Sequence, residues 1–146
     1  MLRAVVLATA LLSSALGACP NNWVTYGLDC YWSSTYTATW RDARTACLAM
    51  ASGSDLVSVH SAAEANFLFT QMGAMDTWIG LNDLSSENNF VWSDGSSVDF
   101  TNWMDGQPNN LLDQDCVNVQ DPATGKWDDN HCKENKNFIC KIRGSS

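Results

Sequence analysis

Basic residues are scarce in this chain. Its 146 residues include 8 lysines and arginines against 16 aspartates and glutamates, which gives a formal net charge of −8. Nucleic acids and anionic membranes attract proteins through basic surfaces, so neither is an expected partner. The acidic balance suits the binding of cations, or simply solubility.

Long apolar runs are also missing. The one apolar stretch, residues 4–12, is much shorter than the roughly 20 residues that a membrane-spanning helix needs. It follows a basic start at Arg3 and leads into small residues, which is the pattern of a secretory signal peptide. We therefore predict a signal peptide over residues 1–18 and one secreted, extracellular domain over residues 19–146.

Two further absences limit the chemistry. The chain has no Asn-x-Ser/Thr sequon, so N-glycosylation is not expected. Histidine occurs only as His60 and His131, and neither has a recognisable nucleophile with an orienting partner in the sequence. We predict that the protein is not an enzyme; a hydrolase that uses His131 is the competing hypothesis.

Six cysteines lie in the predicted secreted domain: Cys19, Cys30, Cys47, Cys116, Cys132 and Cys140. An even number in a secreted domain indicates three disulfides, although six cysteines allow 15 connectivities. A local bond between Cys19 and Cys30 would close a short hairpin around Gly27. No clustered Cys/His spacing points to zinc.

Two helices are expected in the first half of the domain. Thr39 with Asp42, and Ser61 with Glu64, form capping-box patterns that begin a helix. The apolar faces at helical spacing are Trp40, Ala43, Cys47 and Met50 in the first helix, and Ala65, Leu68, Phe69 and Met72 in the second.

Short strands account for most of the remaining pattern. Apolar and aromatic runs predict strands at residues 30–33, 56–59, 78–81, 90–92, 116–119, 126–128 and 138–140. We expect an antiparallel set, and therefore an α+β fold with helices packed beside the sheet. Residues 93–114 show no periodicity, and a loop of that length in a compact domain is either functional or disordered. The flanking cysteines and Trp103 favour an ordered, functional loop.

The stretch from residue 107 to 132 concentrates oxygen-bearing side chains. It contains Gln107-Pro108-Asn109-Asn110, Gln114-Asp115-Cys116 and Trp127-Asp128-Asp129-Asn130-His131-Cys132. Calcium takes about six to eight oxygen ligands from carboxylates, amides and backbone carbonyls. The cluster therefore predicts a calcium site; the alternative is that these residues only form solvated turns.

These motifs together resemble a C-type lectin domain. The matching pieces are Trp78-Ile79-Gly80-Leu81, Phe90-Val91-Trp92-Ser93-Asp94-Gly95, Gln107-Pro108-Asn109, Gln114-Asp115-Cys116-Val117, Trp127-Asp128-Asp129 and Phe138-Ile139-Cys140, in the order of the family. The resemblance implies a double-loop α+β fold, two helices beside antiparallel sheets, and the pairs Cys47–Cys140 and Cys116–Cys132. The additional pair Cys19–Cys30 resembles the long form of the domain.

The resemblance also implies two calcium sites. The sugar-binding calcium would take its ligands, which also hydrogen-bond the sugar, from Gln107, Asn109, Gln114, Asp128 and Asp129, with a cis bond before Pro108. An auxiliary calcium would use Asp83, Glu87, Asn110 and Asp115, with Gln114 shared. Calcium bound in this way accepts two neighbouring sugar hydroxyls as ligands, so binding would depend on calcium and be weak at each site. Tight adhesion would then need homo-oligomers.

The sequence departs from the family pattern in two places. Gln-Pro-Asn replaces Glu-Pro-Asn, associated with mannose, and Gln-Pro-Asp, associated with galactose. No aromatic platform follows the tripeptide, so we favour mannose-, glucose- or fucose-type ligands over galactose. Gln114 stands where an acid is usual, and Asp128 replaces an amide, which predicts a weaker calcium site. Asp113 is an alternative ligand.

The biological role follows only by analogy with the family. We predict recognition of glycans outside the cell, with microbial glycans and innate defence as one possibility. The alternative is a calcium-binding, lectin-like protein that recognises mineral, ice or a protein partner. Elution from a sugar resin by free sugar would separate these hypotheses.

Overall fold

The computed structural model describes residues 18–109 and 113–144. Nearly all of the predicted signal peptide and the proposed ligand Asn110 lie outside these residues. The elements, in chain order, are β1 (Val24–Tyr26), β2 (Asp29–Ser33), α2 (Trp40–Met50), β3 (Ser54–Leu56), α3 (Ala62–Thr70), β4 (Thr77–Asn82), β5 (Val91–Trp92), β6 (Cys116–Val119), β7 (Trp127–Asn130) and β8 (Asn137–Ile142). None of the helices in the described ranges is long and apolar enough to cross a membrane.

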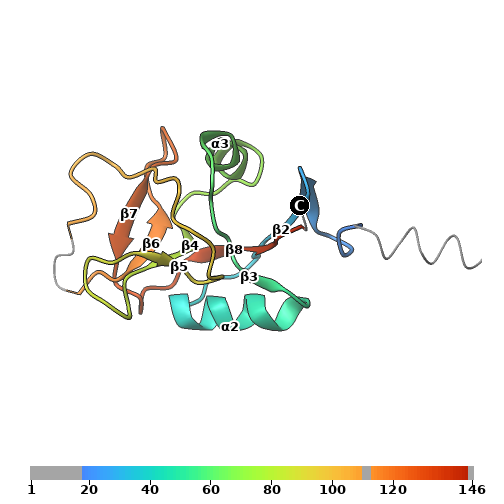
Figure 1. The fold of residues 1–146 in the computed structure, drawn as a ribbon, viewed down its shortest axis with the longest axis horizontal. Coiled ribbons are helices and arrows are strands. Elements are labelled where there is room, and N and C mark those ends of the chain that lie inside the picture. The colour runs from blue at the N-terminus through green and yellow to red at the C-terminus, as the bar shows by residue number, and fades with distance from the viewer. Residues whose placement is uncertain (1–17, 110–112, 145–146) are drawn as a thin grey trace, which may run out of the picture.

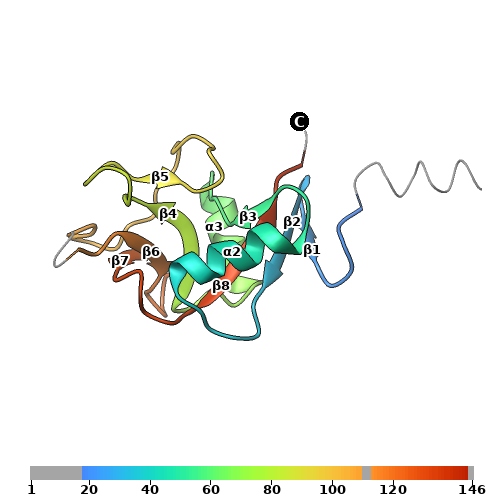
Figure 2. The same ribbon diagram turned by 90° about the horizontal axis from the view of Figure 1, so that it is seen from below.

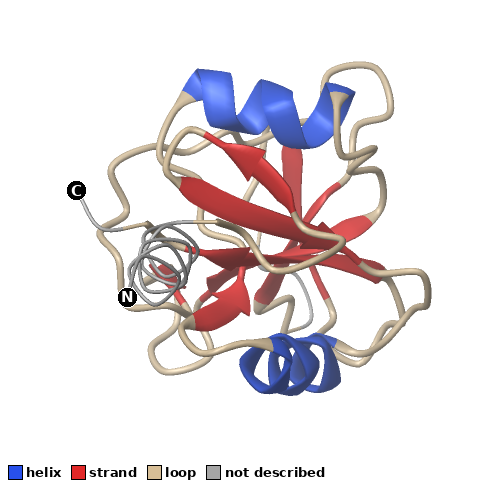
Figure 3. Cartoon of the chain, turned by 90° about the vertical axis from the view of Figure 1, so that its right-hand side faces the viewer, coloured by secondary structure: helices blue, strands red, loops and turns tan. Residues whose placement is uncertain are grey.

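The two helices lie on opposite sides of the strands (Figures 1 and 3). The sheet has the order β1-β2-β8-β4-β6-β7, with β3 added beside β8 and β5 beside β4. The predicted α+β class is confirmed. The expectation of purely antiparallel pairing is wrong at one place, because β4 and β8 pair in parallel through Trp78 and Phe138.

Both helices begin at the predicted caps. The Thr39 hydroxyl accepts a hydrogen bond from the Asp42 N–H at 3.3 Å, and Ser61 accepts one from the Glu64 N–H at 3.0 Å. Each bond satisfies one of the free donors at a helix start. Glu64 also accepts a bond from the backbone N–H of His60 at 2.7 Å, which completes a capping arrangement at α3.

The predicted apolar faces are only partly right. In α2, Trp40, Ala43 and Cys47 are buried, but Met50, the last helical residue, is exposed. In α3 the buried aromatic residue is Phe67, which stacks on Tyr26 at a ring distance of 4.2 Å, whereas Phe69 and Met72 are only half-buried. The added hairpin β1–β2 covers the side of α3 that the periodicity had left to solvent.

The predicted strand at residues 56–59 is also misplaced. β3 ends at Leu56, and the following residues are buried without strand pairing. The reason is a change of partner: the N–H of Val57 donates to Ile139 in β8, while its carbonyl accepts from Gly80 in β4. Val57 therefore bridges β8 and β4 instead of extending either ladder.

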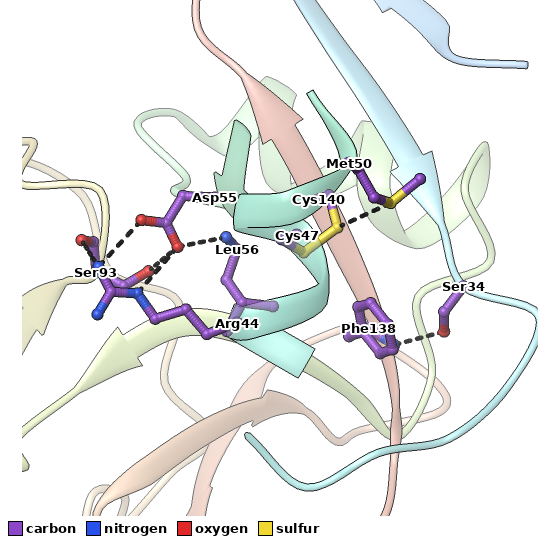
Figure 4. The surroundings of a disulfide bond; sticks show 9 residues. All are labelled: Ser34, Arg44, Cys47, Met50, Asp55, Leu56, Ser93, Phe138 and Cys140. Atoms are coloured by element: carbon purple, nitrogen blue, oxygen red, sulfur yellow. Dashed lines mark hydrogen bonds and ion pairs between the residues drawn. A yellow bond between two sulfur atoms is a disulfide. The ribbon is translucent and has the colours of Figure 1, made fainter. Parts of the chain in front are cut away.

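The three disulfides are those that the family resemblance implied. Cys47–Cys140 joins α2 to β8 (Figure 4), Cys116–Cys132 joins the start of β6 to the turn after β7, and Cys19–Cys30 closes the N-terminal hairpin. In the chain-entropy model the 93-residue separation is worth about 4 to 5 kcal/mol and the 16-residue one about 3 kcal/mol. The predicted pairing is therefore confirmed.

The loop that follows β5 is fastened to α2. Arg44 forms an ion pair with Asp55 at 3.2 Å and donates to the carbonyl of Ser93 at 3.0 Å (Figure 4). The long loop thus starts from a fixed point. Its first part, around Gly95 and Asp99, lines a cavity with Asp29 and Gly144, where the Gly144 N–H donates to Asp29 at 2.7 Å and brings the C-terminal end against β2. Its later part extends to the opposite side of the molecule, beside β6 and β7 (Figures 1 and 2).

Candidate functional site

Trp127 attaches the long loop to the sheet. The indole is 1% exposed and meets the rings of Trp92, Phe100 and Trp103 edge-on, with centroids 5.7 to 6.1 Å away. Its backbone N–H donates to Asn102 at 2.8 Å, and its carbonyl accepts from Met104 at 2.9 Å. The loop and the strand that carries the two acids after Trp127 are therefore held as one unit.

Asp129 meets the Gln-Pro-Asn segment directly. Its carboxylate is fully buried and accepts a hydrogen bond from the backbone N–H of Asn109 at 3.3 Å. The same N–H is 3.0 Å from the side-chain oxygen of Gln107. The bond between Gln107 and Pro108 is cis, as the resemblance implied. The structure thus brings together three of the five residues proposed to bind sugar.

Asp128 lies beside this group on β7. Its Oδ1 is buried and has no hydrogen-bond partner among the described residues. Burial raises the pKa of the Asp128 carboxyl, and the neighbouring Asp129 raises it further. Gln114, the fifth proposed ligand, is half-buried and lies two residues before β6 begins.

A second acidic cluster lies where β4 ends and β6 begins. Carboxylate oxygens of Asp83, Glu87 and Asp115 all fall within 4.8 Å of one another. The backbone positions the pair, since the Asp83 N–H donates to the Asp115 carbonyl at 3.0 Å. The Oδ1 atoms of Asp83 and Asp115 are buried without a hydrogen-bond partner in the described part of the chain. Three of the four proposed auxiliary ligands are thus together; the fourth, Asn110, is not described.

The electrostatics of this cluster favour a cation. Burial raises the pKa of both Asp83 and Asp115, the charge of Glu87 adds to the effect on Asp83, and the carboxyl of Asp83 adds to the effect on Asp115. The charge of Asp129 also contributes to the raised pKa of Asp115. The two acidic clusters therefore interact electrostatically. Buried carboxylate oxygens that lack donors are the ligand type that calcium takes, so these residues fit the ion that the resemblance implies.

A set of hydrogen-bonded polar side chains on the side of α3 was not predicted from the sequence. The ring of His60 lies 2.7 Å from Asp99 and 3.1 Å from the hydroxyl of Ser58, an order that resembles a hydrolytic triad. Ser58 is completely buried, however, and its hydroxyl donates to Asp94 at 2.5 Å. The hydroxyl is therefore unavailable as a nucleophile. No spacing in the sequence relates residues this far apart.

Comparison with known proteins identifies the family. The Lectin C-type domain family matches residues 36–142. This chain is a C-type lectin domain protein. It is 42% identical over 134 residues to Lectin BRA-3 of Megabalanus rosa, a match that covers 90% of the chain and 83% of that lectin.

Solved C-type lectin structures have the same fold. The C-type lectin CEL-I from Cucumaria echinata superposes with a TM-score of 0.81 at 35% identity, covering 87% of this chain and 99% of CEL-I. A calcium-independent type II antifreeze protein superposes with a TM-score of 0.78 at 28% identity, covering 88% of this chain and 96% of that protein. The family is not enzymatic, and the lectin relatives indicate a carbohydrate-binding lectin.

Proposed function

We propose that this protein is a secreted lectin whose sugar binding depends on calcium. The observation that carries the proposal is the set of buried carboxylate oxygens without donors among the described residues, on Asp83, Asp115 and Asp128. The cis Gln107–Pro108 bond and the contact of Asp129 with Asn109 support it. The lectin relatives supply the ligand class, and the acidic clusters supply the dependence on the ion.

The residues divide into two proposed calcium sites. Asp83, Glu87 and Asp115, with Asn110 and shared Gln114, would hold an auxiliary ion that neutralises the loop carboxylates. The site for sugar would use Gln107, Asn109, Gln114, Asp128 and Asp129. Two adjacent sugar hydroxyls would then occupy the coordination positions of this calcium that the protein leaves open.

The side chains around that ion select the sugar. The amides of Gln107 and Asn109 can each present an oxygen acceptor or a nitrogen donor to a hydroxyl group. Asp129 supplies acceptors only, and its fixed position against the Asn109 N–H sets the orientation of the tripeptide. We favour mannose-, glucose- or fucose-type sugars, because no aromatic residue follows Asn109 to support the flat face of galactose.

Binding of this kind is shallow, so we propose that oligomers supply the avidity for adhesion to cells. The expected setting is extracellular, with microbial surface glycans as the candidate ligands. Both parts of this step rest on the resemblance to the family.

The decisive experiment is retention on mannose- and galactose-coupled resins in calcium. We expect retention on mannose, with elution both by EDTA and by free mannose. Asp129→Asn should abolish retention because it removes a buried carboxylate ligand, whereas Asp42→Asn, an exposed acid on α2, should not. A protein that neither resin retains, and that shows no heat when titrated with calcium, would not be a calcium-dependent lectin.

The competing function is binding of mineral, ice or protein by the same fold. The structural likeness to a calcium-independent type II antifreeze protein is the observation that favours this second function. Binding of that kind would persist in the presence of competing monosaccharide. Retention that free sugar does not displace would therefore select it.

A further inference from the structure

A cavity of about 690 Å³ lies between the start of α2 and the turn after β7. Cationic side chains reach it from both segments: Arg41 from the first turn of α2 and Lys133 from the turn. His131 and the hydroxyl-bearing Thr39 also line it. Two cationic side chains therefore line one cavity of a chain whose net charge is −8.

Neither of these two cations has a carboxylate partner in the part of the chain that the structure describes. Over residues 18–109 and 113–144, Arg44, Lys136 and Lys141 each form ion pairs with carboxylates, whereas Lys126 and Arg143, which do not line this cavity, form none. Within the same ranges, Arg41 and Lys133 form no ion pair, and both side chains are exposed. Their charges are therefore available to a ligand.

Helix stability does not explain Arg41. The first turn of a helix favours acids, because the macrodipole places a partial positive charge there. Arg41 opposes that preference, and an anion bound beside it would satisfy the arginine and the helix end together. A basic residue at this position would therefore stabilise a bound anion, whereas it does not stabilise α2.

The backbone holds the two cations close to the proposed calcium ligands. The Trp40 N–H donates to the carbonyl of Cys132 at 3.0 Å, so Arg41 and Lys133 each follow one member of a hydrogen-bonded pair. Cys132 is joined to Cys116, which directly follows Asp115. The Cys116–Cys132 disulfide therefore links the segment that carries Lys133 to the segment that carries Asp115.

We propose that Arg41 and Lys133 form an anion subsite that receives an acidic substituent, a sulfate ester or a carboxylate, of the bound glycan. The inference rests on the proposed sugar binding and extends it to a class of ligand. Asp113 and Asp115 line the same cavity. Asp115 belongs to the proposed auxiliary calcium ligands, and that ion would offset its charge.

The test is a glycan array that carries each glycan in neutral, sulfated and sialylated forms, probed with the full protein in calcium. We expect an acidic form to bind about three to ten times more tightly than its neutral partner, the size that two partly exposed charge contacts give. The sulfated and sialylated arms show which acidic group is accepted. Added inorganic sulfate should remove the preference without abolishing binding of the neutral form.

Matched variants locate the effect. The double variant Arg41→Gln/Lys133→Gln should bind the acidic and neutral forms equally and keep its affinity for the neutral one. Lys126→Gln/Arg143→Gln removes the same charge away from the cavity and should keep the preference. A wild-type array without preference, or a preference that survives in the first double variant, overturns the subsite and leaves sugar binding intact. An array on which no form binds overturns both proposals.

Discussion

Lys141 and Glu64 form a buried ion pair between β8 and α3, with Nζ 2.6 Å from Oε2 and side chains that are 2% and 7% exposed. The Tyr31 hydroxyl donates to the same oxygen, and Lys141 also donates to the Ser58 carbonyl at 3.0 Å. The pair therefore fixes β8, β2 and the start of α3 to one another. Burial, the Glu64 hydrogen bond and its charge all raise the pKa of Tyr31, which keeps the hydroxyl protonated as a donor.

Removing one partner of this pair should be costly. Lys141→Met leaves the Glu64 carboxylate buried without its cation, and we expect a loss of about 3 to 5 kcal/mol in the free energy of unfolding, measured in urea. Lys126→Met, at a partly exposed lysine, should stay within about 0.5 kcal/mol of the wild type. A loss for Lys141→Met below about 1 kcal/mol would show that the pair is solvated in solution.

Calcium removal should destabilise the protein more at neutral than at acid pH. Without the ion, the folded pKa values of Asp83 and Asp115 are raised, so the folded state holds protons more tightly than the unfolded chain. Its stability then falls as pH rises through those folded pKa values. We expect EDTA to lower Tm clearly at pH 7 and much less at about pH 5.

The variant Asp83→Asn provides the control for this pH effect. It removes one titrating ligand of the proposed auxiliary ion and leaves the proposed sugar site intact, so EDTA should lower its Tm less than that of the wild type at pH 7. An EDTA effect in the wild type that is equal at both pH values would contradict the assignment of these carboxyls to a calcium site.

The charge at position 114 should set calcium affinity. Gln114 supplies an amide where an acid is usual in the family, and Gln114→Glu adds a charge to the proposed ligand set. We expect calcium affinity to rise roughly tenfold by calorimetry, since affinity follows the ligand charge count. Gln71→Glu adds the same charge at the exposed end of α3 and should have no effect. Equal affinities in all three proteins would place Gln114 outside the site.

Gly80 should tolerate no side chain. A Cβ at this position in β4 would lie 2.8 Å from the Ser93 hydroxyl and 3.0 Å from the Leu56 carbonyl. We expect Gly80→Ala to cost about 1 to 3 kcal/mol in urea unfolding. Adding Ser93→Ala should recover only part of the loss, because the backbone contact with Leu56 remains. Full recovery would show that the hydroxyl alone sets the limit.

Local signals predicted the features that depend on local chemistry. Capping residues Thr39 and Ser61 begin both helices, and the strand runs around Trp78, Val117 and Phe138 fall inside β4, β6 and β8. The disulfide pairs required the family resemblance, because six cysteines alone leave 15 connectivities open.

Features that depend on packing between distant segments of the chain could not be predicted from the sequence. The burial of Phe67 depends on a hairpin that covers α3, and the parallel pairing of β4 with β8 joins two segments that are far apart in the sequence. Within the candidate site, the composition of residues 107–132 indicated Asp115, Asp128 and Asp129 as proposed ligands, whereas Asp83 and Glu87 were implied only by the family resemblance. The position of Arg41 and Lys133 on one cavity, without a carboxylate partner among the described residues, became visible only in the structure, because the two residues lie far apart in the sequence.

The contact between Gly144 and Asp29 has a practical consequence for surface display. The C-terminal end of the described chain is held against the N-terminal hairpin, on the side of the molecule opposite to the later part of the long loop (Figure 1). A tether attached at either end would therefore leave the part of the loop that carries Gln107 and Asn109 pointing into solvent. Beads, sensor chips or engineered scaffolds that carry many copies would present their recognition faces outward without further redesign.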